Sequence, residues 1–167
     1  RGKIVGIVRG RMEYGPRALC NRSILAEPVD NEINQSLNNR LNRTEFMPFA
    51  PVITIENARK IFIGFKDSDV TSQFMTISYK VFEQFHDIIP AVVHLDGTAR
   101  PQVVTEESNP FIHKLLNEYE LISGIPAFIN TSFNAHEEPI VYSTIDAIRA
   151  FKFGAVDCLI IEDYLIE

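Results

Sequence analysis

Apolar runs separated by short polar segments predict strands along the whole chain. Lys3 to Val8 is a nearly continuous run of Ile and Val, which is typical of a strand buried on both faces in a mixed or parallel sheet. Residues 74 to 82 alternate most regularly between apolar and polar positions, which favours a half-buried strand. Further strands are predicted at residues 23–26, 52–55, 91–95, 102–105, 125–129 and 156–161, and the one at 102–105 is expected to return beside the one at 91–95.

Helices are predicted where apolar residues recur at intervals of three or four behind a capping residue. The clearest begins with Asn109 as N-cap and Pro110 in the first turn, carries one apolar stripe and ends at Gly124. A second is capped by Ser143, with Asp146 three residues on as its capping-box partner. Shorter helices are predicted after Asp30 and at residues 56–62.

Strands and helices interleaved in this way indicate an α/β or α+β domain, in which a mixed, twisted sheet is flanked by helices. With 167 residues, 46% of them hydrophobic, the chain can bury one core, and no linker divides it, so we predict a single domain over 1–167. No apolar run approaches the roughly 18 residues that span a bilayer, and no signal peptide is visible. We therefore expect a cytoplasmic protein that does not contact membranes.

The charge of the chain is unevenly distributed. Residues 1–43 hold eight Lys and Arg against four Asp and Glu, whereas residues 44–167 hold eight against eighteen, which gives local net charges of +4 and −10. A basic segment inside an acidic chain favours a local anionic ligand over a nucleic-acid surface, which needs a broad basic face. DNA binding is therefore not expected.

The segment after the first predicted strand has the composition of an anion site. It carries Arg11, Arg17 and Arg22, whose guanidinium groups match carboxylate or phosphate oxygens two at a time. The Gly-Pro pair at 15–16 permits a tight turn that presents backbone N–H groups beside them. The alternative is a solvated arginine-rich loop in which Glu13 is the local counter-charge.

Two further polar segments are expected at strand ends. Residues 96–102 lie between two apolar runs, and residues 130–134, Asn-Thr-Ser-Phe-Asn, follow the predicted strand at 125–129. In open α/β sheets the ligand crevice lies outside the carboxyl ends of the strands, so hydroxyls and amides placed there favour ligand recognition. The alternative for residues 130–134 is a turn that satisfies its own backbone.

The same segments carry a family resemblance that spans nearly the whole chain. The chain resembles the C-terminal domain of the O-carbamoyltransferase family, which includes nodulation-factor and antibiotic carbamoyltransferases. Thr131-Ser-Phe-Asn134 is also similar to the Thr-Ser-x-Asn signature of YrdC-like domains that form carbamoyl-AMP. The matching blocks, in order, are Gly10-Arg-Met-Glu-Tyr-Gly-Pro-Arg-Ala-Leu, Asn21-Arg-Ser-Ile-Leu-Ala, Pro48-Phe-Ala-Pro51, His94-Leu-Asp-Gly-Thr-Ala-Arg100, Asn130-Thr-Ser-Phe-Asn134 and Pro139-Ile-Val.

The resemblance implies a YrdC-like fold and a carbamoyl-activating reaction. Such a domain would form carbamoyl-adenylate from carbamoyl phosphate and ATP, with Mg²⁺ carried in by ATP, for transfer to a hydroxyl acceptor. Transfer would occur in an N-terminal catalytic domain of the same polypeptide. The chain begins at Arg1 and enters a predicted strand almost at once, so we expect a fragment of a longer two-domain protein. The alternative function is a non-catalytic nucleotide- or anion-binding module.

Arginines and the residues 130–134 supply the predicted ligand contacts. The arginines would neutralise phosphates, the Thr and Ser hydroxyls would donate to phosphate oxygens, and the two Asn amides suit a carbamoyl group. No catalytic residue and no metal site is predicted, His94 and His136 are more typical of surface residues, and Asp96 and Glu138 are outer-shell candidates for Mg²⁺. The predicted binding residues are Arg11, Arg17, Arg22, Ser23, Arg43, Arg100, Asn130, Thr131, Ser132 and Asn134.

Four positions depart from the family pattern. Cys20 stands where the family usually has Gly after Ala-Leu, and Glu137 stands where it has Gly before Glu-Pro. In the block that usually reads Arg-Glu-x-Phe-Arg-Pro, this chain has Thr44 and Met47. Met47 loses a cation, and Met47 and Glu137 are the departures that favour the binding-module alternative.

Overall fold

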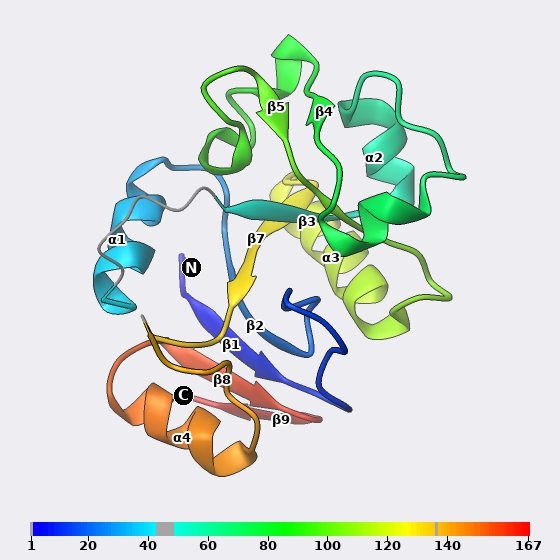
Figure 1. Ribbon diagram of the computed structural model, residues 1–167. Coiled ribbons are helices and arrows are strands. Elements are labelled where there is room, and N and C mark those ends of the chain that lie inside the picture. Colours follow the sequence, from blue (N-terminus) through cyan, green and yellow to red (C-terminus); the bar gives the residue numbers. More distant parts are fainter. Residues whose placement is uncertain (1, 43–48, 136) are drawn as a thin grey trace. The chain divides into compact units, whose positions relative to one another are not determined.

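The computed structural model describes residues 2–42, 49–135 and 137–167 (Figure 1). Contacts within the chain divide it into two compact units. The first unit contains residues 1–27, 32–48 and 130–167, and the second contains residues 28–31 and 49–129. A single domain over 1–167 stays a prediction.

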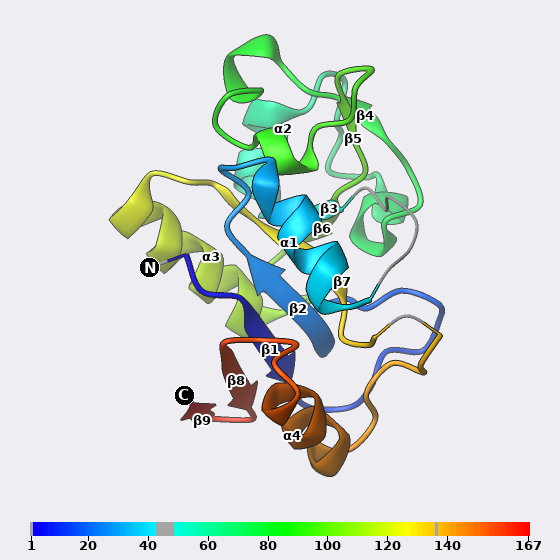
Figure 2. The same cartoon turned by 90° about the vertical axis from the view of Figure 1, so that its left-hand side faces the viewer.

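The first unit is built on a mixed sheet with the strand order β2-β1-β8-β9. Strand β1 pairs antiparallel with β2, where Val5 lies opposite Leu25, and parallel with β8, where Val5 lies opposite Cys158. Strand β9 pairs antiparallel with β8. Figures 1 and 2 both place helix α4 beside β1 and β8. The bounds are Val5–Val8 (β1), Arg22–Ala26 (β2), Glu32–Arg40 (α1), Thr144–Lys152 (α4), Cys158–Ile161 (β8) and Tyr164–Ile166 (β9).

Two local predictions in this unit are confirmed. Strand β1 lies in a mixed sheet with three of its four residues buried, as the continuous apolar run indicated, although it begins at Val5 and not at Lys3. Helix α4 begins with a complete capping box, in which the Ser143 hydroxyl accepts the N–H of Asp146 and the Asp146 carboxylate accepts the N–H of Ser143. These contacts satisfy two N–H groups that no carbonyl of the first turn can reach.

The second unit combines a parallel strand pair with two helices. Strand β3 pairs parallel with β6, and β4 pairs antiparallel with β5. Helix α3 begins with the Asn109 side chain accepting the N–H of Ile112 and ends at Gly124 with φ +75°, as predicted. Strand β7 crosses from this unit into the first. The bounds are Ala50–Thr54 (β3), Ile55–Ile61 (α2), Tyr79–Lys80 (β4), Thr98–Ala99 (β5), Gln102–Val104 (β6), Pro110–Ser123 (α3) and Ala127–Ser132 (β7).

Two strand predictions in the second unit are wrong, and so is one predicted strand pairing. Val70–Phe74 is a 3₁₀ helix that ends at Met75 with φ +54°, so the backbone is not extended there and only Tyr79–Lys80 of 74–82 forms a strand. Pro90–Val92 is also a 3₁₀ turn. The strand prediction for 91–95 failed because a short buried apolar run is compatible with either structure. Strand β6 therefore does not return beside residues 91–95 but pairs with β3.

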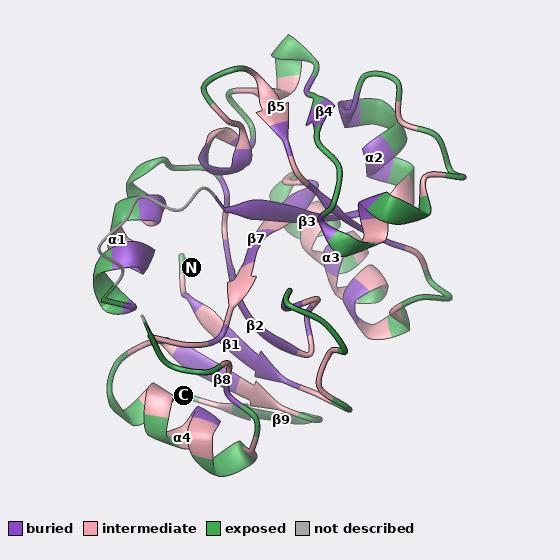
Figure 3. Cartoon of the chain, in the orientation of Figure 1, coloured by how far each residue is buried: buried purple, intermediate pink, exposed green. Residues whose placement is uncertain are grey.

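The mixed α/β class is confirmed by these elements. The strands are mostly buried, while the helices expose one side (Figure 3). Among the described residues, no helix is long and apolar enough to cross a membrane. In the first unit, Phe133, which follows β7, packs closely against β1 at Gly6. A Cβ atom on Gly6 would lie 2.8 Å from the ring of Phe133, so only glycine fits beneath that ring.

Two departures from the family pattern lie at special backbone positions. Cys20 has φ +76° and Glu137 has φ +62°, in the left-handed region that residues with a Cβ atom rarely adopt. The glycine that the family pattern has at both positions is the residue that adopts this region without strain. The two substitutions therefore keep the backbone conformation at a cost in stability.

We predict that Glu137→Gly raises the free energy of unfolding by about 0.5 kcal/mol, because the strain relieved, about 1 kcal/mol, exceeds the entropy gained by the unfolded chain. Urea denaturation measures this. Glu138→Gly is the matched control, since its φ is not positive, and it should lower stability by roughly 0.4 to 1 kcal/mol. Equal destabilisation by both substitutions would contradict the strain at Glu137.

The carboxylate of Asp157 links β1 to the end of α1. It accepts the N–H of Ile4 at 2.8 Å and is paired with Arg40 at 2.6 Å. Burial alone would raise the pKa of Asp157, but the Ile4 N–H and the Arg40 guanidinium outweigh burial and lower it below its ordinary value. A carboxyl whose pKa is lower in the folded state stabilises above the unfolded pKa, and this contribution is lost as pH falls through the folded pKa.

We predict that Asp157→Asn lowers the free energy of unfolding by about 1 to 2 kcal/mol at pH 7, and that the difference from wild type shrinks below about pH 4. Urea denaturation at pH 7, 5 and 3 measures both effects. Asp163→Asn is the control, because its ion pair with Arg9 is exposed and should contribute less than about 0.5 kcal/mol. If the free energy of unfolding of Asp157→Asn stays below that of wild type by the same amount down to pH 3, this role of Asp157 is contradicted.

Candidate functional site

The loop of residues 9–21, here called the arginine loop, joins β1 to β2 and is closed by one carboxylate. A single oxygen of Glu13 accepts the N–H groups of Leu19 at 2.6 Å, Asn21 at 2.8 Å and Arg22 at 3.2 Å. The Asn21 side chain donates to the carbonyl of Arg11 at 2.9 Å. Glu13 therefore organises the backbone of the loop, which the counter-charge alternative did not include.

Arg22 is buried at the base of this loop. Its side chain, in a residue that is 7% exposed, donates to the carbonyls of Arg9, Gly10, Asn21 and Tyr142 at 2.7 to 3.3 Å. Four carbonyl partners give this guanidinium a structural role. Its role in ligand binding stays a prediction.

Ser23 also serves the loop backbone. It is fully buried, and its hydroxyl accepts the N–H of Cys20 at 2.8 Å. This contact supports the left-handed conformation of Cys20 described above. A ligand contact by Ser23 stays a prediction as well.

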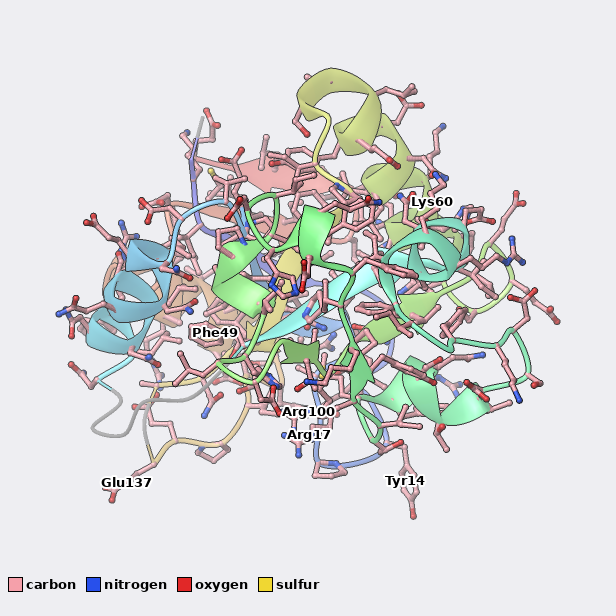
Figure 4. The ribbon with its side chains drawn as sticks, turned by 90° about the horizontal axis from the view of Figure 1, so that it is seen from above. Tyr14, Arg17, Phe49, Lys60, Arg100 and Glu137 are labelled. Atoms are coloured by element: carbon pink, nitrogen blue, oxygen red, sulfur yellow. The ribbon has the colours of Figure 1, made fainter. Side chains whose placement is uncertain are left out.

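The outer part of the arginine loop is exposed. Arg11 and Arg17 are both exposed, and no carboxylate among the described residues pairs with either of them. Tyr14, between them, projects outward into solvent in Figure 4. Cations held on an ordered loop, without an acidic partner there, are what an anionic ligand requires.

Residues 130–134, here called the asparagine segment, contact the arginine loop directly. The Asn130 side chain donates to the carbonyl of Ala18 at 3.0 Å, and the N–H of Phe133 donates to the carbonyl of Arg22 at 3.1 Å. The loop and the segment, which are more than 100 positions apart in the sequence, therefore lie together. The segment lies at the carboxyl end of a strand, as predicted, but β7 runs two residues later at its start and three later at its end than the predicted 125–129, so Asn130, Thr131 and Ser132 are its last residues.

The end of the asparagine segment is tied to its own turn. The Ser132 hydroxyl donates to the Asn134 side-chain oxygen at 2.5 Å, and the Asn134 amide donates to the carbonyls of Ala135 and Glu138. This is the arrangement that the turn alternative predicted. The structure thus gives Ser132 and Asn134 a local role, and their ligand contacts stay predictions.

A cleft of about 620 Å³ opens beside this turn in the first unit. Ile140, Ala150 and Phe153 give it an apolar lining, to which Asn134 and Glu138 add polar atoms. The carbonyl of Tyr142, another lining residue, accepts the Nε–H of Arg22, so the wall of the cleft is bonded to the base of the arginine loop. An apolar cleft with a few polar atoms is typical of small-molecule sites.

Two arginines on this cleft were missed by sequence reasoning. Arg40, at the end of α1, and Arg149, on α4, both line it. Arg40 is paired with Asp157, whereas no ion pair of Arg149 is found among the described residues. No motif in the sequence marked either residue. Their proximity to Asn134 depends on long-range contacts that the sequence does not reveal.

The segment 94–100 lies in the second unit and forms a short hairpin turn. The Thr98 hydroxyl donates to the Asp96 carboxylate at 2.7 Å and therefore accepts from Nδ1–H of His94 at 3.0 Å. Hydrogen bonds from Thr98 lower the pKa of Asp96. The segment 96–102 was expected only as a polar stretch at a strand end, but Thr98–Ala99 form strand β5 and Gln102 begins β6.

The predicted site residues are thus partly brought together. Arg100 belongs to the second unit and is half-buried, while Arg43, Thr44, Met47 and His136 lie outside the described residues. Within the described ranges, no group of three or more His, Cys, Asp or Glu residues is arranged to hold a metal ion. The predicted binding residues that lie in the first unit are Arg11, Arg17, Arg22, Ser23, Asn130, Thr131, Ser132 and Asn134.

Comparison with known proteins gives consistent relatives. Nodulation protein NolNO of Sinorhizobium fredii is 39% identical over 167 residues, which cover 99% of this chain and 24% of that protein. The 3'-hydroxymethylcephem-O-carbamoyltransferase of Amycolatopsis lactamdurans is 34% identical over 97% of this chain and 30% of that protein. The chain therefore spans about a quarter to a third of the length of such relatives.

A solved structure shares the fold. HypF, in its phosphate- and nucleotide-bound form, superimposes with a TM-score of 0.62 at 19% identity, over 96% of this chain and 19% of that chain. At this identity the likeness concerns the fold alone. The profile described as carbamoyltransferase C-terminus matches residues 1–167. The chain therefore belongs to the carbamoyltransferase C-terminus family.

Proposed function

We propose that this chain is the carbamoyl-activating domain of an O-carbamoyltransferase, which forms carbamoyl-adenylate from carbamoyl phosphate and ATP. The observation that carries the proposal is the hydrogen bond from Asn130 to the carbonyl of Ala18, next to Arg17. It joins the exposed cations of the arginine loop to the amide and hydroxyl groups of the asparagine segment. Family membership and the nucleotide-bound state of HypF support the choice of substrates.

The reaction needs charge neutralisation and positioning more than covalent help from the protein. One water cleaves carbamoyl phosphate to carbamate and inorganic phosphate. A carbamate oxygen then bonds to the α-phosphorus of ATP, and the bond from that phosphorus to the bridging oxygen breaks to release pyrophosphate. Two anionic substrates must be held together against their repulsion, which is the task of Arg11 and Arg17.

The cleft beside Asn134 provides a place for the rest of the nucleotide. Its apolar lining suits a planar base, and Arg149 adds a cation on the same cleft. Mg²⁺ would arrive with ATP and screen its phosphates, and Glu138 is the lining carboxylate that suits an outer-shell position. Asp96 suits this position less, because its carboxylate already accepts the N–H and hydroxyl of Thr98.

Transfer to the acceptor is assigned to an N-terminal domain of the same polypeptide. The relatives are three to four times longer than the matched region, which leaves room for such a domain. The non-catalytic binding module remains the second candidate, and the departure that favours it is Met47. Glu137 favours it less, because its left-handed backbone explains the usual glycine by conformation alone.

We predict that Arg17→Ala weakens ATP binding by about 10- to 150-fold, the equivalent of losing a charge-assisted hydrogen bond of roughly 1.5 to 3 kcal/mol, and leaves the melting temperature nearly unchanged. Calorimetric titration and thermal denaturation measure the two effects. Arg59→Ala is the control, since that exposed arginine is paired with Asp67. A large loss of stability with unaltered affinity would make Arg17 a structural residue instead.

We also predict that the 167-residue chain, given ATP, Mg²⁺ and carbamoyl phosphate, releases pyrophosphate slowly and only when carbamoyl phosphate is present. It should carbamoylate no acceptor without the N-terminal domain, because no acceptor base is identified among its described residues. A coupled pyrophosphate assay measures the release. Release that ignores carbamoyl phosphate would overturn the assignment. No release, beside an active full-length enzyme in the same assay, would favour the binding module.

A further inference from the structure

Glu13 closes the arginine loop at a single point. One oxygen of its carboxylate receives N–H groups from three residues at 2.6 to 3.2 Å, and all three lie six to nine positions further along the chain. The exposed residues 14–17 are therefore held as a short closed loop above the carboxylate. Three N–H donors on one oxygen satisfy a charge that would otherwise be costly in this half-buried position.

The same carboxylate does not act as an ion-pair partner. No guanidinium or ammonium group among the described residues lies within ion-pair distance of Glu13. Its carboxylate therefore interacts with backbone N–H groups and does not pair with the neighbouring arginines, which remain able to bind another anion. This separation is what distinguishes Glu13 from a surface counter-charge.

Arg17 lies between two fixed points of the loop. On its N-terminal side, Glu13 ties the loop back to Leu19, and on its C-terminal side the carbonyl of Ala18 accepts the Asn130 amide at 3.0 Å. A long side chain binds an anion well only when its backbone is already placed, because otherwise the ligand must supply the ordering free energy. The two anchors supply that order in advance.

We propose that Glu13 is a positioning residue, whose carboxylate fixes the loop so that Arg17 is ready for a phosphate group. This inference rests on the proposed function, since it assumes that Arg17 contacts a phosphate-bearing ligand. It assigns Glu13 no contact with the ligand. Glu13 therefore acts on affinity through Arg17, and its effect must disappear when the Arg17 side chain is absent.

A double-mutant cycle with ATP as the probe tests this dependence. Glu13→Ala should weaken ATP binding by about 10-fold in the wild-type background, and by less than about 2-fold in the Arg17→Ala background. Glu13→Gln keeps an acceptor oxygen without the charge, so it should weaken ATP binding by less than Glu13→Ala does. Glu118→Ala, which removes an exposed carboxylate on α3, is the control and should leave affinity unchanged.

Amide hydrogen exchange supplies an independent readout on the same variants. The N–H groups of Leu19 and Asn21 should exchange faster in Glu13→Ala, while those of α3 keep their protection. Equal losses of affinity from Glu13→Ala with and without the Arg17 side chain would overturn the positioning role. So would unchanged exchange at Leu19 and Asn21. If Arg17→Ala alone leaves ATP affinity unaltered, the ligand role of Arg17 fails, and the positioning role falls with it.

Discussion

The first unit depends on the packing of Phe133 against Gly6. The ring is completely buried, and it lies so close to β1 that a Cβ atom on Gly6 would meet it at 2.8 Å. On either side of the ring, the backbone of Phe133 donates to Arg22 and accepts from Val141 at 2.9 Å. Burial of a phenyl ring contributes about 2 to 3 kcal/mol, and here it also fixes where the asparagine segment leaves the sheet.

Charged groups near this contact divide into two kinds. Glu13 and Arg22 are turned toward the backbone, where the carboxylate receives N–H groups and the guanidinium donates to carbonyls of the same loop. Arg11 and Arg17 are turned toward solvent. These backbone contacts of the inner pair hold the loop in one conformation, and a loop fixed in this way makes the outer pair useful to a ligand. One short sequence therefore contains both the frame and the contacts of the proposed site.

The sequence predicted local features better than long-range ones. The capping residues Asn109 and Ser143 set helix starts through contacts within three positions, so pattern and structure agree. Residues 91–95 were misassigned because a short apolar run fits a strand or a 3₁₀ turn equally well. Residues 74–82 were misassigned because their alternation continues through Met75, where the backbone is left-handed and the extended conformation is interrupted. Strand β9 was not predicted, because three residues with two exposed side chains give no clear pattern.

The site was predicted to a similar extent. The arginines and the asparagine segment could be identified as candidate ligand-binding residues from their side chains. The sequence did not reveal that Arg22 and Ser23 face the loop backbone. Nor could it reveal Arg149 on the cleft, because the helix that carries it is 10 to 20 positions from the asparagine segment and is brought back only by folding. The left-handed conformation at Cys20 and Glu137 gives a physical reason for the glycines that the family pattern has there.

The central claim is that the arginine loop and the asparagine segment form one site for a phosphate-bearing ligand. Backbone amide chemical shifts of the isotope-labelled chain, recorded while ATP and then carbamoyl phosphate are added, test it most directly. The account predicts saturable shifts at Arg17, Ala18 and residues 130–134 together, with one shared dissociation constant. Shifts confined to the separate pocket of the second unit, which Lys80, His86 and Asp96 line, would contradict it.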